Sequence, residues 1–566
     1  MTAPARGRAT LTGILLLASG TALAQTAAPP VKCTELAQPA TAGYDFTSTL
    51  NRWGGKNGYG ATAGMHRVNS IAVNTLPIFD ENDPRENNFL FRWANAVHID
   101  TRPDVITDQL IFKKAQWVDD HMLAESERIL RSRQYVSDAA IRVLRQCGDD
   151  VDLEVVSREV WTLTPELNFK STGGQSTSSI GIRDSNILGS GQLVDLKYKD
   201  DPERSSWGIS YKNPNIGGTH ATLSTELADN SDGHHYVVEA AQPFYSLDDK
   251  HGWRLAWEST TEVLNQYSFG QRISSLDHSL RSADVSYGES DGLIDGKVSR
   301  FSGGVRMLTQ TWQQVPGQVA PAGFVPALDL YYPYVQYDYI EDNFVTGYNI
   351  SQIHRTEDLQ LGLQVRSRVG YAGEGGGNVM FDGDLSDTLL YEPGMLLQLM
   401  ANWDMRWNRD RARFEDSEAK AELSYQRELD ARRTLFIALT ADKVLNLNNG
   451  KQLLMGGDTG LRGYDNNFIF GNGSVQFTAE HRYFTDFHLL ELARVGFALF
   501  YDAGRMWGNS LPFGDRLYQD VGIGLRLAPS RSESGQVVHI DLAWPLSTDA
   551  PGVAGRQFAV QVKKTF

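Results

Sequence analysis

The sequence predicts a mostly β fold, in which a transmembrane antiparallel β-barrel of about 16 strands follows one small α+β domain. Three observations point to this fold. The chain begins like an exported protein, no later segment is apolar enough for a membrane-spanning helix, and alternating segments dominate from Pro165 onward. We therefore divide the chain into a leader at 1–24, an extension at 25–88, a domain at 89–164 and a barrel at 165–566.

The first residues have the layout of a secretory signal peptide. Arg6 and Arg8 precede an apolar stretch from Leu11 to Ala24, which closes on the tripeptide Ala-Leu-Ala. We therefore expect an exported protein whose mature chain starts at Gln25.

Composition excludes one class of partner and leaves the state of the cysteines open. The formal net charge of −16 argues against a nucleic-acid partner, which would need a basic face. The two cysteines, Cys33 and Cys147, fit an exported protein without a disulfide framework. They can form a disulfide or remain two separate thiols, and the sequence supports both states equally.

A small two-layer domain is expected after a loosely ordered extension. Residues 25–88 are rich in Ala, Pro, Gly, Thr and Asn and show little periodicity. From Phe89 the pattern changes to strand, helix, helix, strand and strand, a β-α-α-β-β order typical of two packed layers. The expected segments are 89–99, 105–112, 119–135, 137–146 and 151–163.

Strand-like segments fill the rest of the chain. Many are near the 9 to 11 residues that a tilted membrane strand needs, and we allow about 25 residues for each strand with its connection. The last strand is the clearest, because apolar side chains alternate with polar or small ones, as between lipid and lumen. The lipid-facing side chains expected there are Phe558, Val560, Val562 and Phe566.

One glycine-rich loop carries an arginine with no neighbouring acid. The loop GGDTGLRGYDNNF, residues 456–468, places Arg462 near its centre. In the next two strands, alternation turns Glu480 and Asp502 toward the lumen, and Gly504 leaves space beside Asp502. A guanidinium makes planar, bidentate bonds with carboxylates, so we expect Arg462 to enter the barrel and pair with both acids.

These motifs resemble the BamA/TamA superfamily of outer-membrane assembly and translocation barrels, also called the bacterial surface antigen family. In that family a loop with a V/L-R-G-F/Y motif enters a 16-stranded barrel, and its arginine pairs with acids of the lumen wall. The resemblance assigns the entering loop to 453–470 and the motif to Leu461, Arg462, Gly463 and Tyr464, with partners Glu480, Asp502 and Gly504.

Residues 89–163 resemble a single POTRA domain, the module of this family that adds a substrate or partner strand to its sheet edge. The resemblance implies an assembly, insertion or translocation factor in the outer membrane of a Gram-negative bacterium, with the POTRA domain in the periplasm. Its partners would be outer-membrane lipid, client proteins and a periplasmic protein, without cofactor, metal or covalent chemistry. The first strand, near 179–185, and the last, 558–566, would meet at a weak seam.

Two alternatives stay open. A two-partner secretion pore would export one dedicated substrate, and the single POTRA-like domain departs from assembly factors that carry several. A passive porin or surface antigen would need no such domain. We therefore expect deletion of 89–163 to have no functional consequence only in the passive case.

Overall fold

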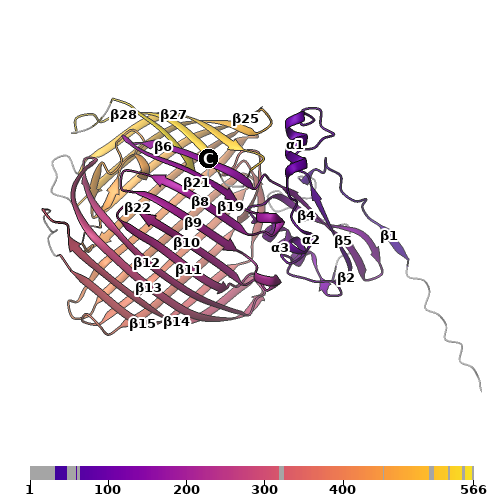
Figure 1. The fold of residues 1–566 in the computed structure, drawn as a ribbon, viewed down its shortest axis with the longest axis horizontal. Helices are drawn as coiled ribbons and strands as arrows, with labels where there is room; N and C mark the ends of the chain where they lie inside the picture. The colour runs from indigo at the N-terminus through magenta and orange to yellow at the C-terminus, as the bar shows by residue number, and fades with distance from the viewer. Residues whose placement is uncertain are drawn as a thin grey trace, which may run out of the picture.

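The computed structural model describes residues 32–46, 59, 64–317, 324–449, 451–508, 515–532, 536–550, 553 and 555–563. The expected leader and Phe566 lie outside these ranges. Figure 1 shows a large β-barrel and a smaller domain against one end of it, which we call the domain end; the opposite end is the loop end. No helix of the described chain combines the length and the apolar character needed to cross a membrane.

The barrel is a closed antiparallel sheet whose strands neighbour one another in chain order. Its members are β6 (Leu163–Thr172), β7 (Gln175–Asp184), β8 (Leu193–Asp200), β9 (Ser205–Asn213), β10 (Thr222–Asn230), β11 (Gly233–Gln242), β12 (His251–Ser268), β13 (Gln271–Ile294), β14 (Lys297–Gln314), β15 (Ala327–Glu341), β18 (Gly362–Ala372), β19 (Asn378–Glu392), β20 (Met395–Asn408), β21 (Arg413–Asp430), β22 (Arg433–Leu445), β25 (Gly473–Leu489), β26 (Ala493–Trp507), β27 (Leu517–Pro529), β28 (Val537–Pro545) and β29 (Gln557–Lys563).

The described residues form a barrel of 20 strands, so the expectation of about 16 was wrong. The error arises mainly at the start of the barrel. Residues 163–242 hold six strands of 8 to 10 residues each, joined in places by turns as short as Gly173-Gly174. About 25 residues per strand was therefore too generous, because short hairpin turns need only two residues.

The outer surface of the barrel is apolar, as expected for strands in lipid. Along the last strand, Phe558 and Val562 are exposed, Val560 is half-buried, and Gln557, Ala559 and Gln561 are buried. The same alternation continues around the wall, where the exposed side chains include Leu167, Ile180, Trp207, Phe301, Val335, Leu439, Phe497 and Ile523.

The smaller domain is a five-stranded sheet with helices against it, in the strand order β1-β4-β5-β2-β3. Its elements are β1 (Cys33–Glu35), β2 (His66–Leu76), α1 (Phe89–Val97), α2 (Pro103–Thr107), β3 (Trp117–Val118), α3 (Asp120–Arg131), β4 (Val136–Cys147) and β5 (Asp150–Glu159). The apolar faces of α2 and α3 pack on this sheet and form one buried core with it.

Two expectations for this region were wrong. β2 lies within the predicted loose extension, yet it runs parallel to β5 in the middle of the sheet, because tertiary pairing outweighs its weak local pattern. Residues 89–97 form a helix, although we predicted a strand. The Asn88 side chain caps this helix by accepting the N–H of Phe91, and Phe91 turns inward as part of a helical face.

A disulfide fixes the first described strand to the sheet. Cys33 and Cys147 are bonded across the β1–β4 pair, where they stand opposite each other in register. The bond closes a sequence separation of 114 residues, so it restricts the unfolded chain strongly. The sequence left this pairing open, because the two residues meet only when β1 joins the sheet.

Candidate functional site

The connection between β22 and β25 folds into the loop end of the barrel. It contains β23 (Leu453–Met455), a short 3-10 turn η4 (Gly457–Thr459) and β24 (Ile469–Gly471). Its buried side chains form one cluster with the wall residues Met506 and Tyr518. The loop residues of that cluster are Met455, Leu461, Tyr464, Phe468 and Ile469. We call residues 446–472 the outer loop.

Arg462 makes the contacts expected from the sequence. Its Nε and Nη2 donate to the two oxygens of Asp502 at 2.7 and 2.9 Å, and its Nη1 donates to Glu480 Oε1 at 2.5 Å. The arginine is 6 % exposed and Asp502 is fully buried. A buried guanidinium with two paired carboxylates is costly to break, because each charge would lose its partner away from bulk water.

Three further residues belong to this cluster, and none of them is predicted as a partner of Arg462 from the sequence. Arg482 Nε donates to the second oxygen of Glu480 at 3.1 Å, and Thr478 Oγ1 donates to Asp502 at 2.9 Å. The Phe500 ring centroid lies 3.5 Å from the Arg462 guanidinium carbon. Alternation places Thr478 and Arg482 on the inward face, but only their position beside the loop identifies them as partners.

Small residues let the outer loop approach the wall. A Cβ added to Gly504 would lie 2.7 Å from the Met455 sulfur, and one added to Gly463 would lie 2.6 Å from Asp520 Cβ. Tyr464 then fixes the far side of the motif, because its hydroxyl donates to the backbone carbonyl of Gln519 at 2.9 Å. Both glycines are therefore required by close approach.

The barrel closes at a short seam. Among the described residues, β29 pairs with β6 at one position, Val560 opposite Ser171, whereas it pairs with β28 at seven. The expectation placed the first strand at 179–185, which is wrong. Residues 179–184 belong to β7, and the first barrel strand is β6. A strand with few partners leaves backbone N–H and C=O groups available.

At the domain end, a second connection reaches into the barrel. It holds the hairpin of β16 (Phe344–Tyr348) and β17 (Thr356–Gln360), and we call residues 342–361 the inner hairpin. The carbonyl of Ile350 accepts bonds from two lumen residues, Gln426 at 3.2 Å and Arg482 at 3.4 Å. Arg482 thus links the inner hairpin to the cluster that holds Arg462.

The inner hairpin is also bound to the smaller domain. The Arg131 side chain on α3 makes a two-bond contact with Asp358, at 2.6 and 2.8 Å. Beside it, the Thr356 hydroxyl donates to Asp138 at 3.1 Å, and His121 Nε2 lies 2.8 Å from Asp342 Oδ2. The domain therefore contacts the barrel interior through this hairpin.

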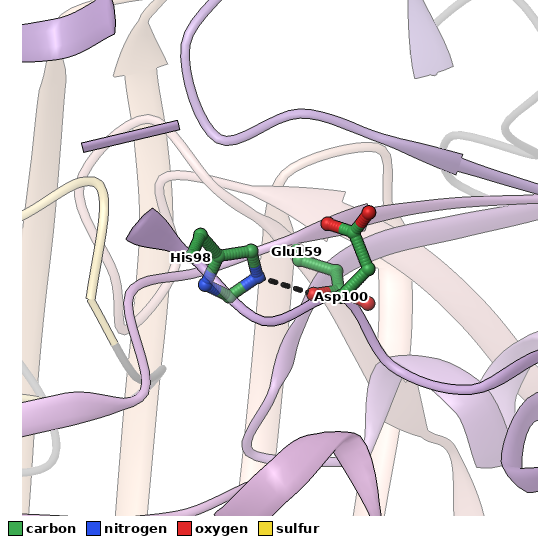
Figure 2. Close-up of side chains that lie close together, drawn as sticks. All are labelled: His98, Asp100 and Glu159. Carbon is green, nitrogen blue, oxygen red and sulfur yellow. Dashed lines mark hydrogen bonds and ion pairs between the residues drawn. The ribbon is translucent and has the colours of Figure 1, made fainter. Parts of the chain in front are cut away.

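Two groups of side chains in the described chain have the composition of a cation site, namely His98 with Asp100 and Glu159, and His121 with Glu125 and Asp248. Figure 2 shows His98, Asp100 and Glu159 close together where the smaller domain meets the barrel. Glu159 is already bound by protein groups, since one oxygen lies 2.5 Å from His98 Nε2 and the other accepts the Thr101 N–H at 2.7 Å. Burial and the Glu159 charge raise the pKa of Asp100. We interpret His98, Asp100 and Glu159 as a structural contact, because both Glu159 oxygens are already bound by protein groups.

Comparison with known proteins identifies the part of the chain that bears the arginine loop. Residues 437–566 match the model of the Omp85 superfamily domain. They run from within β22 to the end of the chain, and so include the outer loop with Arg462, both of its acidic partners and the last strand.

Solved structures with some likeness include BamA from Haemophilus ducreyi lacking POTRA domains 1-3, at 13 % identity and a TM-score of 0.36 over 88 % of this chain and 84 % of that chain. CdiB from Acinetobacter baumannii is 11 % identical, with a TM-score of 0.38 over 88 % of this chain and 74 % of that chain. OccK10 (OpdN) from Pseudomonas aeruginosa is 11 % identical, with a TM-score of 0.34 over 66 % of this chain and 97 % of that chain. No curated protein sequence matches the chain. The similarity to the Omp85 superfamily domain thus covers residues 437–566, the part of the chain that holds Arg462 and its acidic partners.

Proposed function

We propose that this protein assembles, inserts or translocates other proteins at the outer membrane of a Gram-negative bacterium, without covalent chemistry. The smaller domain acts as a POTRA domain in the periplasm and receives the client. The seam between β6 and β29 then offers strand edges on which a client strand pairs. The Omp85 domain at 437–566 supports this assignment.

The observation that carries the proposal is the seam. A single residue pair joins β29 to β6 in the described chain, while the neighbouring β28–β29 and β6–β7 ladders have seven and ten. An unpaired edge templates another strand, and the hydrogen bonds a client strand makes there replace few existing ones. The barrel is therefore weakest where a client strand would enter.

The outer loop supports the same function in another way. Arg462, Glu480 and Asp502 hold the loop against β25 and β26, close to the C-terminal strands. A wall fixed there can stay closed while the seam opens, so that opening is confined to one place. The same loop narrows the lumen, which favours handling of protein at the seam over free diffusion of solutes.

A disulfide across the seam tests the proposal directly. Ser171→Cys with Val560→Cys places cysteines at the one described pair, and Val285→Cys with Val305→Cys is the control pair on the outer face of the β13–β14 wall. We expect oxidation of the seam pair to deplete a defined set of outer-membrane or exported proteins as a gene deletion does. A reductant should restore them, and the control should change nothing.

The same comparison separates the alternatives. Depletion of one exported protein alone would identify a dedicated secretion pore. An unchanged set of proteins in the locked strain, with altered uptake of small solutes in the deletion strain, would contradict the proposal and identify a passive pore.

A further inference from the structure

Helix α1 exposes an apolar stripe to solvent. Phe89, Leu90, Trp93 and Val97 are 73 %, 66 %, 56 % and 46 % exposed. At 3.6 residues per turn these four side chains lie within roughly 100° of the helix circumference. Monomeric soluble surfaces rarely gather large apolar side chains in this way, so the stripe indicates a contact with another apolar phase.

The opposite face of α1 is fixed firmly. Phe91 is buried and stacks on Phe79 with ring centroids 4.0 Å apart. The Asn95 side chain accepts the N–H of Phe79 at 3.2 Å and donates to its carbonyl at 3.0 Å. The stripe therefore cannot turn inward without breaking these contacts, and its exposure is built into the fold.

The segment Ile78-Phe79, on which α1 packs, is attached to the domain end of the barrel. Arg531, in the turn between β27 and β28, donates to the carbonyl of Ile78 at 3.1 Å, and its guanidinium lies 5.4 Å from the Phe79 ring centroid. The Arg531 carbonyl accepts the N–H of Trp161, just before β6, at 2.8 Å. The helix is thus held beside the strands that flank the seam.

The barrel wall is apolar up to this rim. Three apolar side chains are exposed here: Phe487 at the end of β25 (60 %), Leu490 in the turn after it (76 %) and Leu163 at the start of β6 (47 %). In Figure 1, α1 stands at the rim near β25 and runs crosswise to the direction from barrel to domain. A helix in this position lies parallel to the membrane surface at the edge of the apolar wall.

We propose that α1 is an interfacial membrane helix, whose stripe of Phe89, Leu90, Trp93 and Val97 inserts into the lipid leaflet at the domain end of the barrel. Tryptophan is favoured at the lipid headgroup level, and short amphipathic helices bind lipid through such a face. The occupant we assign is lipid, because the stripe continues the apolar outer wall of the barrel. Arg92, exposed on another side of α1, remains in water.

The test compares two adjacent positions in the full-length protein. Trp93→Cys and Arg92→Cys each provide one free thiol, since Cys33 and Cys147 are bonded to each other. Each variant is labelled with an environment-sensitive fluorophore and reconstituted in vesicles of phosphatidylethanolamine and phosphatidylglycerol, with and without nitroxide-bearing lipid. We expect a blue-shifted emission and at least threefold stronger nitroxide quenching at position 93 than at position 92.

Two results would overturn the inference. Equal, weak quenching at both positions would show that the stripe faces water. Blue-shifted emission at position 93 without quenching by nitroxide lipid would show that protein covers the stripe. As a second variant, Leu90→Ser with Trp93→Ser should reduce the quenching of a label at Val97→Cys by at least half, while the barrel keeps its heat-dependent gel mobility.

Discussion

Two irregular segments enter this barrel, one from each end, and they are held differently. The outer loop is bound to the wall by Arg462, which contacts two acids of neighbouring strands and is 6 % exposed. The inner hairpin is bound to the wall by the Ile350 carbonyl and to the smaller domain by Asp358, whose side chain is 19 % exposed.

The difference separates a fixed element from a connecting one. The buried ion pairs of Arg462 with Glu480 and Asp502 fix the outer loop to the barrel wall. The inner hairpin divides its contacts between wall and domain, and Glu357 stiffens its tip by accepting the N–H groups of Ile350, Ser351 and Gln352. Movement of the domain would therefore displace the inner hairpin first. The displacement would reach Arg482, which contacts Ile350, before it reaches Arg462.

The largest expected effect comes from Arg462→Ala. Removal of the guanidinium leaves the Asp502 and Glu480 carboxylates buried with fewer partners, at a cost of about 3–5 kcal/mol. The measurement is the urea concentration at the midpoint of unfolding, with the folded fraction detected by its heat-dependent gel mobility. Lys170→Ala is the control, because its pair with Asp458 touches the same loop from an exposed position. An equal midpoint in both variants would refute a structural role for Arg462.

Arg462→Lys should fall between alanine and the parent. An ammonium keeps the charge but cannot make the planar contact to both oxygens of Asp502 while it reaches Glu480, so we expect a loss of about 1–3 kcal/mol. The same unfolding experiment measures it. A lysine variant as stable as the parent would show that charge alone, without geometry, holds the outer loop.

A smaller effect is expected at the inner hairpin from Asp358→Asn. The change removes the ionic contact with Arg131, and a hydrogen bond to a charged group is worth about 1.5–3 kcal/mol. We expect faster proteolysis at the junction of domain and barrel, with unchanged heat-dependent mobility of the barrel. Thr356→Val, which removes a single hydroxyl hydrogen bond to Asp138 and no ionic contact, serves as the milder control. Loss of barrel stability would contradict the division drawn between the two segments.

The smallest effect is a pH dependence of the same junction. The hydrogen bond to Asp342 raises the pKa of His121 above 6.5, and burial raises the pKa of Glu127 to about 7. A raised histidine pKa adds stability below 6.5 that is lost as pH rises through the folded value. A raised carboxyl pKa acts in the same direction, because the stability of the folded state falls as pH rises from 4.5 to about 7 and stays lower above that.

The junction should therefore be protected better from proteolysis at pH 6 than at pH 8, by an amount on the order of 1 kcal/mol. His121→Gln should remove the part of this change that lies above pH 6.5. Stronger protection at pH 8 would reverse the assigned directions.

Much of the candidate site could be predicted because strand alternation is a local property. Glu480 and Asp502 point inward from their positions along a strand, and only two neighbouring strands are needed to bring them together. The partners from further away could not be found. The contact between Arg482 and the Ile350 carbonyl depends on how the inner hairpin folds into the lumen, which no short window of sequence contains.

The sequence by itself determined that the chain forms an apolar-walled barrel and that Arg462 needs carboxylates, since period-two patterning and charge act locally. Only the tertiary structure decided the number of strands, the place of β2, the Cys33–Cys147 bond and the helix at Phe89–Val97. Each of these depends on partners distant in the chain, or on a cap and a buried face that form together. Local propensity is weak beside such contacts, and closure of a barrel is a property of the whole sheet.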